Sequence, residues 1–303
     1  MLSLLRMRLH LALTLWIVLT DVMATSAGKG AELKRLDSVL GAQAIPLKRT
    51  GKAMPLIYTS AIAHRLANQM TNQNDPAATI AAQLVDILLE ALPDDLGALR
   101  GVTVQATVAG LIHFEVGDRA ITVWLDQILT NSLPSQRWPP VPMAERERQA
   151  MLESAAIFEA QYAHARCCSL LRLAHREAFI NLETLEALPC DWRLNSFTPL
   201  SWLTTSAQLS LNHPADRYLL VQLVDAFDRL SDPSPQRTLA SLVRSAQAVS
   251  QAFQVFHRTH PLCDHTGQEP ALVTAQLGLL MATQRILYWL LADGLHLCPV
   301  SEL

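Results

Sequence analysis

The sequence predicts a mainly α-helical protein in which a small α/β domain precedes a C-terminal all-α bundle. Nearly every segment after Met143 follows a helical period, with few β-branched runs and few glycines. Two β-rich runs, 101–108 and 111–116, stand earlier in the chain. A proline-rich stretch around Trp138 separates the two patterns and predicts a linker.

The composition is that of a globular protein. Of the 303 residues, 50% are hydrophobic and 17% are charged, which excludes a disordered chain or a coiled coil. The formal net charge of -3 argues against a general polyanion binder. The 5 cysteines form no CxxC pair, so neither a disulfide framework nor a zinc ribbon is indicated. We expect no cofactor and no metal ion.

Residues 1–27 have the pattern of a signal peptide. Arg6 and Arg8 precede an apolar run, and small residues follow it. The run is too short for a comfortable membrane span, so we expect no membrane anchor. A misread start codon is the alternative, with Met23 or Met54 as the true start, and we favour it slightly over export.

The sequence predicts a basic linker at residues 28–57. All lysines of the chain lie here, and with two arginines they give the stretch 29–52 six positive charges against two negative ones. Every later basic residue is arginine or histidine, and the guanidinium group of arginine suits phosphate recognition and stacking on bases.

The sequence predicts the small α/β domain at residues 58–131, with its helices and strands in the order α-α-β-β-α. Asn74-Asp75-Pro76 predicts a turn that starts the second helix, and Ala109-Gly110 predicts a hairpin between the two strands. The expected elements are helices at 58–70, 77–91 and 120–129 and strands at 101–108 and 111–116.

The sequence predicts a linker at residues 132–142 and the helical bundle at residues 143–303. The stretch 181–212 has no clear period, and we interpret it as a long, partly packed connection. Helices are expected at about 144–177, 214–231, 235–258 and 270–293.

A specific resemblance lies in the bundle. The run Gln161–Arg172, QYAHARCCSLLR, resembles the first long helix of the DALR anticodon-binding domain of arginyl-tRNA synthetases, whose consensus begins Q-Y-A-H-A-R and continues C-S-I-L-R. Further similar blocks follow in the same order, so the resemblance covers nearly all of residues 146–303. These blocks are Leu211–Asp216, Gln251–His257 and Ala275–Leu297.

The chain departs from the family pattern at several positions. Gln276 replaces the usual arginine, Asp293 replaces asparagine, and the helix before Phe253 has lost its tyrosines. These departures put RNA binding in doubt.

The N-terminal half resembles, more weakly, the additional domain of bacterial arginyl-tRNA synthetases. In those enzymes this domain contacts tRNA near its elbow. The matching positions are Tyr58, Ser60, Ala61, Leu66-Ala67, Pro76, Ile80, Ala81, Leu84 and Gly110–Phe114.

The chain lacks the residues that the family uses for catalysis. A synthetase would carry a nucleotide-binding domain between the two resembling parts, whereas here only the linker 132–142 stands there. There is no H-x-G-H sequence, and a K-M-S-K-S loop is impossible because Lys52 is the last lysine. The groups that would bind ATP phosphates are missing. We therefore predict a protein that is not an enzyme.

The resemblance implies a tRNA-binding protein, with arginine tRNA as the expected partner and its anticodon loop as the contact. Tyr162, His164 and Arg166 could instead fix their helix by packing and hydrogen bonds. The candidate tRNA-binding residues are Gln161, Tyr162, His164, Arg166, Phe253 and Phe256 in the bundle and Lys48, Arg49 and Lys52 in the basic stretch.

The predicted function is that of a catalytically inactive, cytoplasmic accessory protein, with a tRNA-modifying enzyme or another protein as a further partner. The alternative is a protein–protein interaction module that kept the DALR fold and lost RNA binding. A zinc site is a weaker hypothesis, since the spacing of its four candidate ligands also fits an ordinary turn. Those ligands are His257, His260, Cys263 and His265.

Overall fold

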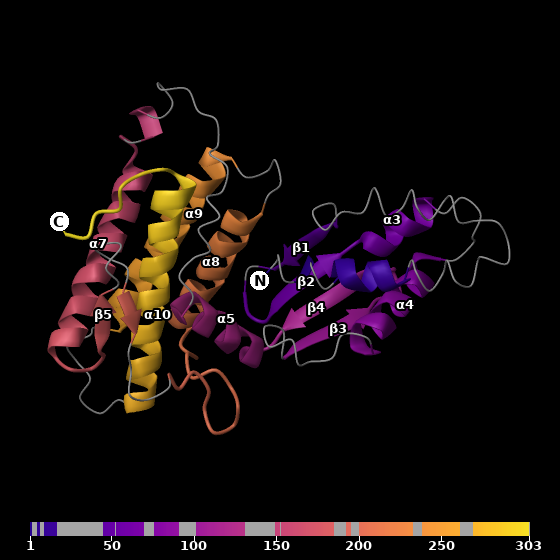
Figure 1. The fold of residues 1–303 in the computed structure, drawn as a ribbon, viewed down its shortest axis with the longest axis horizontal. Coiled ribbons are helices and arrows are strands. Elements are labelled where there is room, and N and C mark those ends of the chain that lie inside the picture. Colours follow the sequence, from indigo (N-terminus) through magenta and orange to yellow (C-terminus); the bar gives the residue numbers. More distant parts are fainter. Residues whose placement is uncertain are drawn as a thin grey trace. The chain divides into compact units, whose positions relative to one another are not determined.

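The computed structural model describes residues 1, 5–6, 9–16, 45–51, 53–69, 76–90, 101–130, 149–151, 153–184, 192–194, 200–232, 238–260 and 269–302. The chain divides into two compact units, Met1–Val123 and Trp124–Leu303, so the boundary falls within helix α5 (Asp118–Thr130). The fold class is confirmed, because helices dominate the described residues and a small antiparallel sheet accompanies them (Figure 1).

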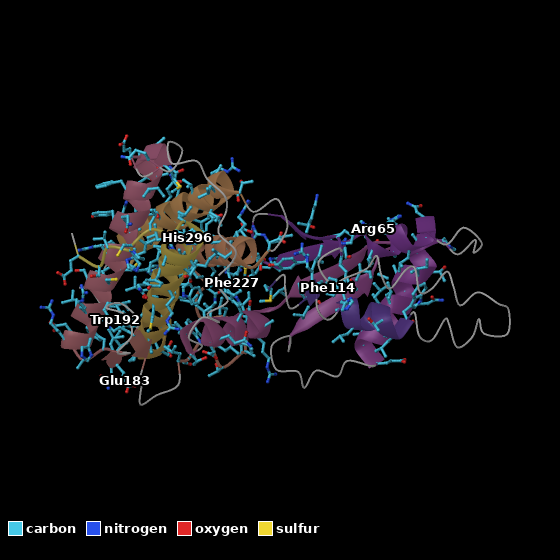
Figure 2. The ribbon with its side chains drawn as sticks, turned by 45° about the horizontal axis from the view of Figure 1, so that its top comes forward. Arg65, Phe114, Glu183, Trp192, Phe227 and His296 are labelled. Atoms are coloured by element: carbon cyan, nitrogen blue, oxygen red, sulfur yellow. The ribbon has the colours of Figure 1, made fainter. Side chains whose placement is uncertain are left out.

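The first unit contains a four-stranded antiparallel sheet in the order β1-β2-β4-β3. Alternate side chains of β2 and β4 are buried, as expected for a sheet with one face in the core. Tyr58 and Phe114 are paired neighbours at its centre, and Figure 2 labels Phe114 there. The strands are β1 (Leu47–Thr50), β2 (Leu56–Ser60), β3 (Val102–Ala106) and β4 (Ile112–Val116).

Two helices, α3 (Ile62–Gln69) and α4 (Ala77–Glu90), accompany this sheet. Helix α4 buries a face that includes Ile80, Leu84 and Leu88, and it packs on β3 and on α3. The predicted hairpin is confirmed. Gly110 in its turn has φ +76, and a Cβ there would lie 2.7 Å from the Cβ of Ala77, so only glycine fits.

The helix predicted at 58–70 is wrong at its start. Residues 56–60 form β2, because the alternating Leu-Ile-Tyr-Thr-Ser pattern pairs on one side with β1 and on the other with β4. Strand β1 itself lies inside the stretch that the sequence predicts as a basic linker.

Part of the signal-like segment is packed in the first unit. Residues 9–16 are helical, and Leu9, Leu13 and Trp16 are buried. The indole N–H of Trp16 donates a hydrogen bond to Oε1 of Gln83 in α4, at 2.9 Å. The choice between a leader and a misread start stays a prediction. Among the helices that the structure describes, none has the length and apolarity needed to cross a bilayer.

The second unit is a helical bundle around α10 (Pro270–Trp289). Almost every residue of α10 is buried, because the helix contacts α7, α8 and α9. A π-helical turn, Leu290–Gly294, continues it. The surrounding helices are α7 (Ala155–Arg176), α8 (Pro214–Ser231) and α9 (Leu239–Thr259).

Three of the four helices predicted in the bundle are confirmed to within four residues. The helix predicted at 144–177 is interrupted: residues 149–151 are helical, but Ser154 has extended φ/ψ and caps α7 by accepting a hydrogen bond from the N–H of Ile157. The predicted connection 181–212 contains a short hairpin, β5 (Leu182–Thr184) with β6 (Trp192–Leu194).

Candidate nucleic-acid interface

Helix α7 presents an aromatic stripe to solvent. Phe158 is 67% exposed and Tyr162 is 44% exposed. They are four residues apart, so they are neighbours on the helix surface, and Arg166 follows at the same spacing. We call Phe158, Tyr162 and Arg166 the α7 stripe. Rings and a guanidinium plane in one row are the groups on which unpaired bases stack.

Arg166 is held at the edge of the stripe by His257 of α9. Its Nη2 lies 3.4 Å from Nε2 of His257, and the His257 ring stacks on Phe253. Burial lowers the pKa of His257, and the charge of Arg166 lowers it further. The imidazole is therefore neutral at pH 7 and can accept a hydrogen bond from the guanidinium.

Three residues predicted to contact tRNA are buried instead. His164 is 0% exposed, Phe253 is 1% exposed and Phe256 is 5% exposed. A side chain without accessible surface cannot stack on a base, so the expectation of direct contact does not fit these three positions. The two phenylalanines pack in the bundle, and the side chain of His164 points from α7 to the carbonyl of Val300.

Gln161 and His164 bind the C-terminal segment, residues 298–302. The Gln161 amide donates to the carbonyl of Cys298 at 3.0 Å and accepts from the N–H of Val300 at 2.8 Å. Nδ1 of His164 donates to the carbonyl of Val300 at 2.8 Å. Arg172 adds a hydrogen bond to the carbonyl of Ser301. Residues at i, i+3 and i+11 of one helix therefore hold this segment in place.

Burial lowers the pKa of His164, the hydrogen bond to Val300 opposes this effect, and the charge of Arg172 adds to it. The neutral ring fits its surroundings, because Nε2 can accept a hydrogen bond from Nε2 of Gln284, at 3.1 Å. His164 thus has a structural role.

The basic candidates lie in the first unit. Lys48 is exposed on β1, an edge strand, and Arg49 beside it is half-buried. Lys52 lies outside the described residues. A lysine on an edge strand also discourages pairing with other chains, so its exposure alone does not indicate RNA.

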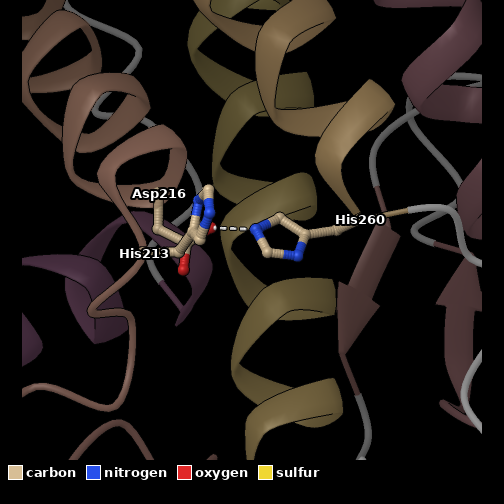
Figure 3. A group of neighbouring side chains, drawn as sticks. All are labelled: His213, Asp216 and His260. Atoms are coloured by element: carbon tan, nitrogen blue, oxygen red, sulfur yellow. Dashed lines mark ion pairs between the residues drawn. The ribbon is translucent and has the colours of Figure 1, made fainter.

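Within the part of the chain that the structure describes, His213, Asp216 and His260 form the group that could hold a metal ion (Figure 3). This group differs from the zinc spacing in the sequence, of which Cys263 and His265 lie outside the described residues. Three residues of these groups were not predicted from the sequence as binding residues: Phe158, His213 and Asp216. Phe158 could have been found, because it precedes Tyr162 by one helical turn.

The geometry defines a helical bundle with an exposed aromatic stripe, joined in sequence to a small α/β unit. No known family model matches the chain, and no solved structure matches it. The chain is similar to the arginine–tRNA ligase of Gloeobacter violaceus, with 36% identity over 135 residues, 43% of this chain and 20% of the relative.

Two further arginine–tRNA ligases are similar. The enzyme of Synechococcus sp. (strain JA-3-3Ab) is 29% identical over 136 residues, which are 45% of this chain and 20% of the relative. That of Chlorobium phaeobacteroides is 30% identical over 134 residues, 43% of this chain and 20% of the relative. The matches thus span about a fifth of the length of these relatives.

Proposed function

We propose that this chain is a tRNA-binding protein and that the α7 stripe is its contact with unpaired bases. The similarity to arginine–tRNA ligases supports a tRNA-related role. The observation that carries the proposal is the exposed pair Phe158 and Tyr162, four residues apart on one helix. Two exposed rings that are neighbours on one helix form an apolar surface that a ligand can cover.

The bound element is proposed to be the anticodon loop of arginine tRNA. Sequence-specific recognition of RNA targets single-stranded loops, whose bases can stack on aromatic rings and arginine. Tyr162 and Arg166 lie in the run QYAHARCCSLLR, which resembles the DALR anticodon-binding helix. We propose that the second unit is a domain of this type.

We further propose that the chain does not attach arginine to tRNA but acts as an accessory protein in the cytosol, for example beside a tRNA-modifying enzyme. The sequence has no H-x-G-H motif and no lysine after Lys52. The purified chain should therefore give no ATP–pyrophosphate exchange with arginine and tRNA. Exchange above background would contradict this part of the proposal.

The binding experiment measures the Kd of fluorescently labelled arginine tRNA by anisotropy at several salt concentrations. Phe158→Ala and Tyr162→Ala should each weaken binding by about 5- to 150-fold, which corresponds to about 1–3 kcal/mol per stacked base. Because these changes remove no charge, the slope of log Kd against log salt should stay unchanged. The matched control is Tyr218→Ala on α8, since Tyr218 is 43% exposed against 44% for Tyr162.

A second pair of variants separates phosphate contacts from base contacts. Lys48→Ala with Arg49→Ala should flatten the salt slope if the basic strand contacts the backbone of the RNA. The thermal midpoint of each variant is measured beside its Kd, so that a loss of folding is recognised. Equal Kd values for the wild type, Phe158→Ala and Tyr162→Ala would refute the role of the α7 stripe.

The alternative function is a protein–protein interaction module. The net charge of -3 favours it, and so does Gln276, which stands where the family has arginine and binds His260 within the bundle. Under this alternative the wild type shows no tRNA binding even at low salt, where electrostatic attraction is strongest.

A further inference from the structure

We propose that His213, Asp216 and His260 form a binding site for one divalent transition-metal ion of the zinc class. The site joins the start of α8 to the end of α9, because His213 is the N-cap of α8 and His260 is the C-cap of α9. Figure 3 shows the ion pair between the carboxyl group of Asp216 and the ring of His260, with the His213 ring beside that carboxyl group. This site is independent of the proposed RNA contact.

The three side chains are already close to coordination geometry. One ligand atom from each lies within 4.8 Å of the others. The rings of His213 and His260 are 5.1 Å apart and nearly perpendicular, so they can approach one ion from different directions. Bonds of about 2.0–2.2 Å place tetrahedral ligands about 3.3–3.6 Å apart. Loading the site therefore requires side-chain shifts of about 1 Å.

The charge balance at Asp216 favours a cation. Its carboxyl group is 1% exposed, and Oδ1 lies 2.7 Å from Nε2 of His260. A buried carboxylate needs a cationic or hydrogen-bonding partner, and His260 is the partner that pairs with it here. Arg217 next to it donates instead to Oδ1 of Asn212, at 2.6 Å. A divalent ion would bind this carboxylate in place of the proton that it shares with His260.

The surroundings of His260 suit a metal-bound ring. Its Nδ1 lies 3.2 Å from Nε2 of Gln276. The oxygen and nitrogen of an amide can exchange places by a flip, so the Gln276 oxygen can accept a hydrogen bond from the Nδ1–H when Nε2 binds a metal. The Phe256 ring lies 5.2 Å away and shields the same imidazole.

His213 leaves one side of the site open. The residue is exposed, and its Nδ1 accepts a long hydrogen bond of 3.2 Å from the N–H of Ala215. Coordination through Nδ1 would replace this bond and leave the proton on Nε2. Two imidazoles and one carboxylate with a free position match the ligands of zinc sites that retain a water molecule. The donor set also suits Co²⁺, which provides a spectroscopic probe.

The experiment titrates the full chain, stripped with a chelator, with Zn²⁺ in competition with a chromogenic chelator. We expect one equivalent of Zn²⁺ and a rise in the thermal midpoint, because an ion that binds only the folded state stabilises it. His213→Ser should weaken binding at least tenfold and abolish the thermal shift. Serine also caps helices well, so this variant should fold. Co²⁺ bound to the wild type should absorb in the visible range without a thiolate charge-transfer band.

The matched control is His296→Asn. His296 is exposed and has φ 55, a conformation that asparagine tolerates, so the change removes an imidazole at little cost. Its affinity for Zn²⁺ should equal that of the wild type. The double variant Cys263→Ser with His265→Asn tests the ligand set suggested by the sequence spacing. The proposal is overturned if this double variant loses the ion while His213→Ser keeps it, or if the wild type binds no Zn²⁺.

Discussion

Replacing Gln161 should loosen the C-terminal segment and leave RNA binding intact. In the structure both ends of this side chain bind main-chain groups, the carbonyl of Cys298 at 3.0 Å and the N–H of Val300 at 2.8 Å. Gln161→Met keeps the length and volume of the side chain and removes both hydrogen bonds. The variant therefore tests these two contacts rather than packing.

The expected magnitude follows from the number of bonds. Each hydrogen bond contributes a net free energy of about 0.5–1.5 kcal/mol, so their loss costs about 1–3 kcal/mol in the free energy of local opening. The Val300 N–H also loses its acceptor. Its hydrogen exchange should accelerate by about 5- to 150-fold.

Hydrogen–deuterium exchange measured by mass spectrometry on C-terminal peptides provides the assay. Glu302→Gln is the control, because the Glu302 carboxylate is 81% exposed at 3.4 Å from Arg172, and such surface ion pairs contribute little. The reasoning is refuted if Gln161→Met weakens tRNA binding and leaves the exchange of Val300 unchanged.

Two further predictions concern the core of the bundle. Gly278→Ala should destabilise the protein by about 1–3 kcal/mol, because the Cβ of the new alanine would lie 2.5 Å from the Trp202 ring. That ring cannot easily move, since its indole N–H donates a hydrogen bond to Asp126 at 2.7 Å. An unchanged urea midpoint, measured by tryptophan fluorescence, would contradict this prediction. His164→Asn should make the free energy of unfolding depend less on pH below about 6.5. The pKa of His164 is lowered from 6.5 in the folded state, so the unfolded state binds the proton first as pH falls. The free energy of unfolding of the wild type therefore decreases by up to about 1.4 kcal/mol per pH unit below about pH 6.5. Equal slopes for the variant and the wild type between pH 5 and 7 would rule this out.

The bundle helices could be predicted because their boundaries are encoded locally. His213-Pro214 and Glu269-Pro270 each place a proline in the first turn, and Thr238 forms a capping box with Ser241. These signals need no knowledge of the fold. The start of α7 at Ser154 was missed because the helical pattern continues through it.

The sheet was only half predictable. The hairpin of β3 and β4 is local, and its turn contains the glycine that the geometry demands. Strand β2 pairs with β4, more than 50 residues further along the chain, and β1 is an edge strand of four residues. Such pairing depends on distant partners, so the short apolar run before α3 was assigned to the helix.

The candidate site was predictable in position but not in roles. The run around Gln161 indicates one functional helix, yet the main-chain groups that Gln161 and His164 bind in the C-terminal segment lie between 136 and 139 residues away. No local pattern reveals that a glutamine faces the C-terminal segment. The metal group is equally non-local, because it joins the first turn of one helix to the end of another.

The spacing along α7 places two sets of side chains on different faces of the helix. Gln161, His164 and Arg172 fall within about 80° of one another on a helix of 3.6 residues per turn, and the α7 stripe is centred about 120° away. The side chains of Gln161, His164 and Arg172 form hydrogen bonds to the C-terminal segment. Phe158 and Tyr162 keep their rings exposed. Similarity over the whole run therefore does not assign RNA contact to each of its residues. Within α7, changes at Gln161, His164 and Arg172 should act on stability, and changes at Phe158 and Tyr162 should act on the proposed RNA binding.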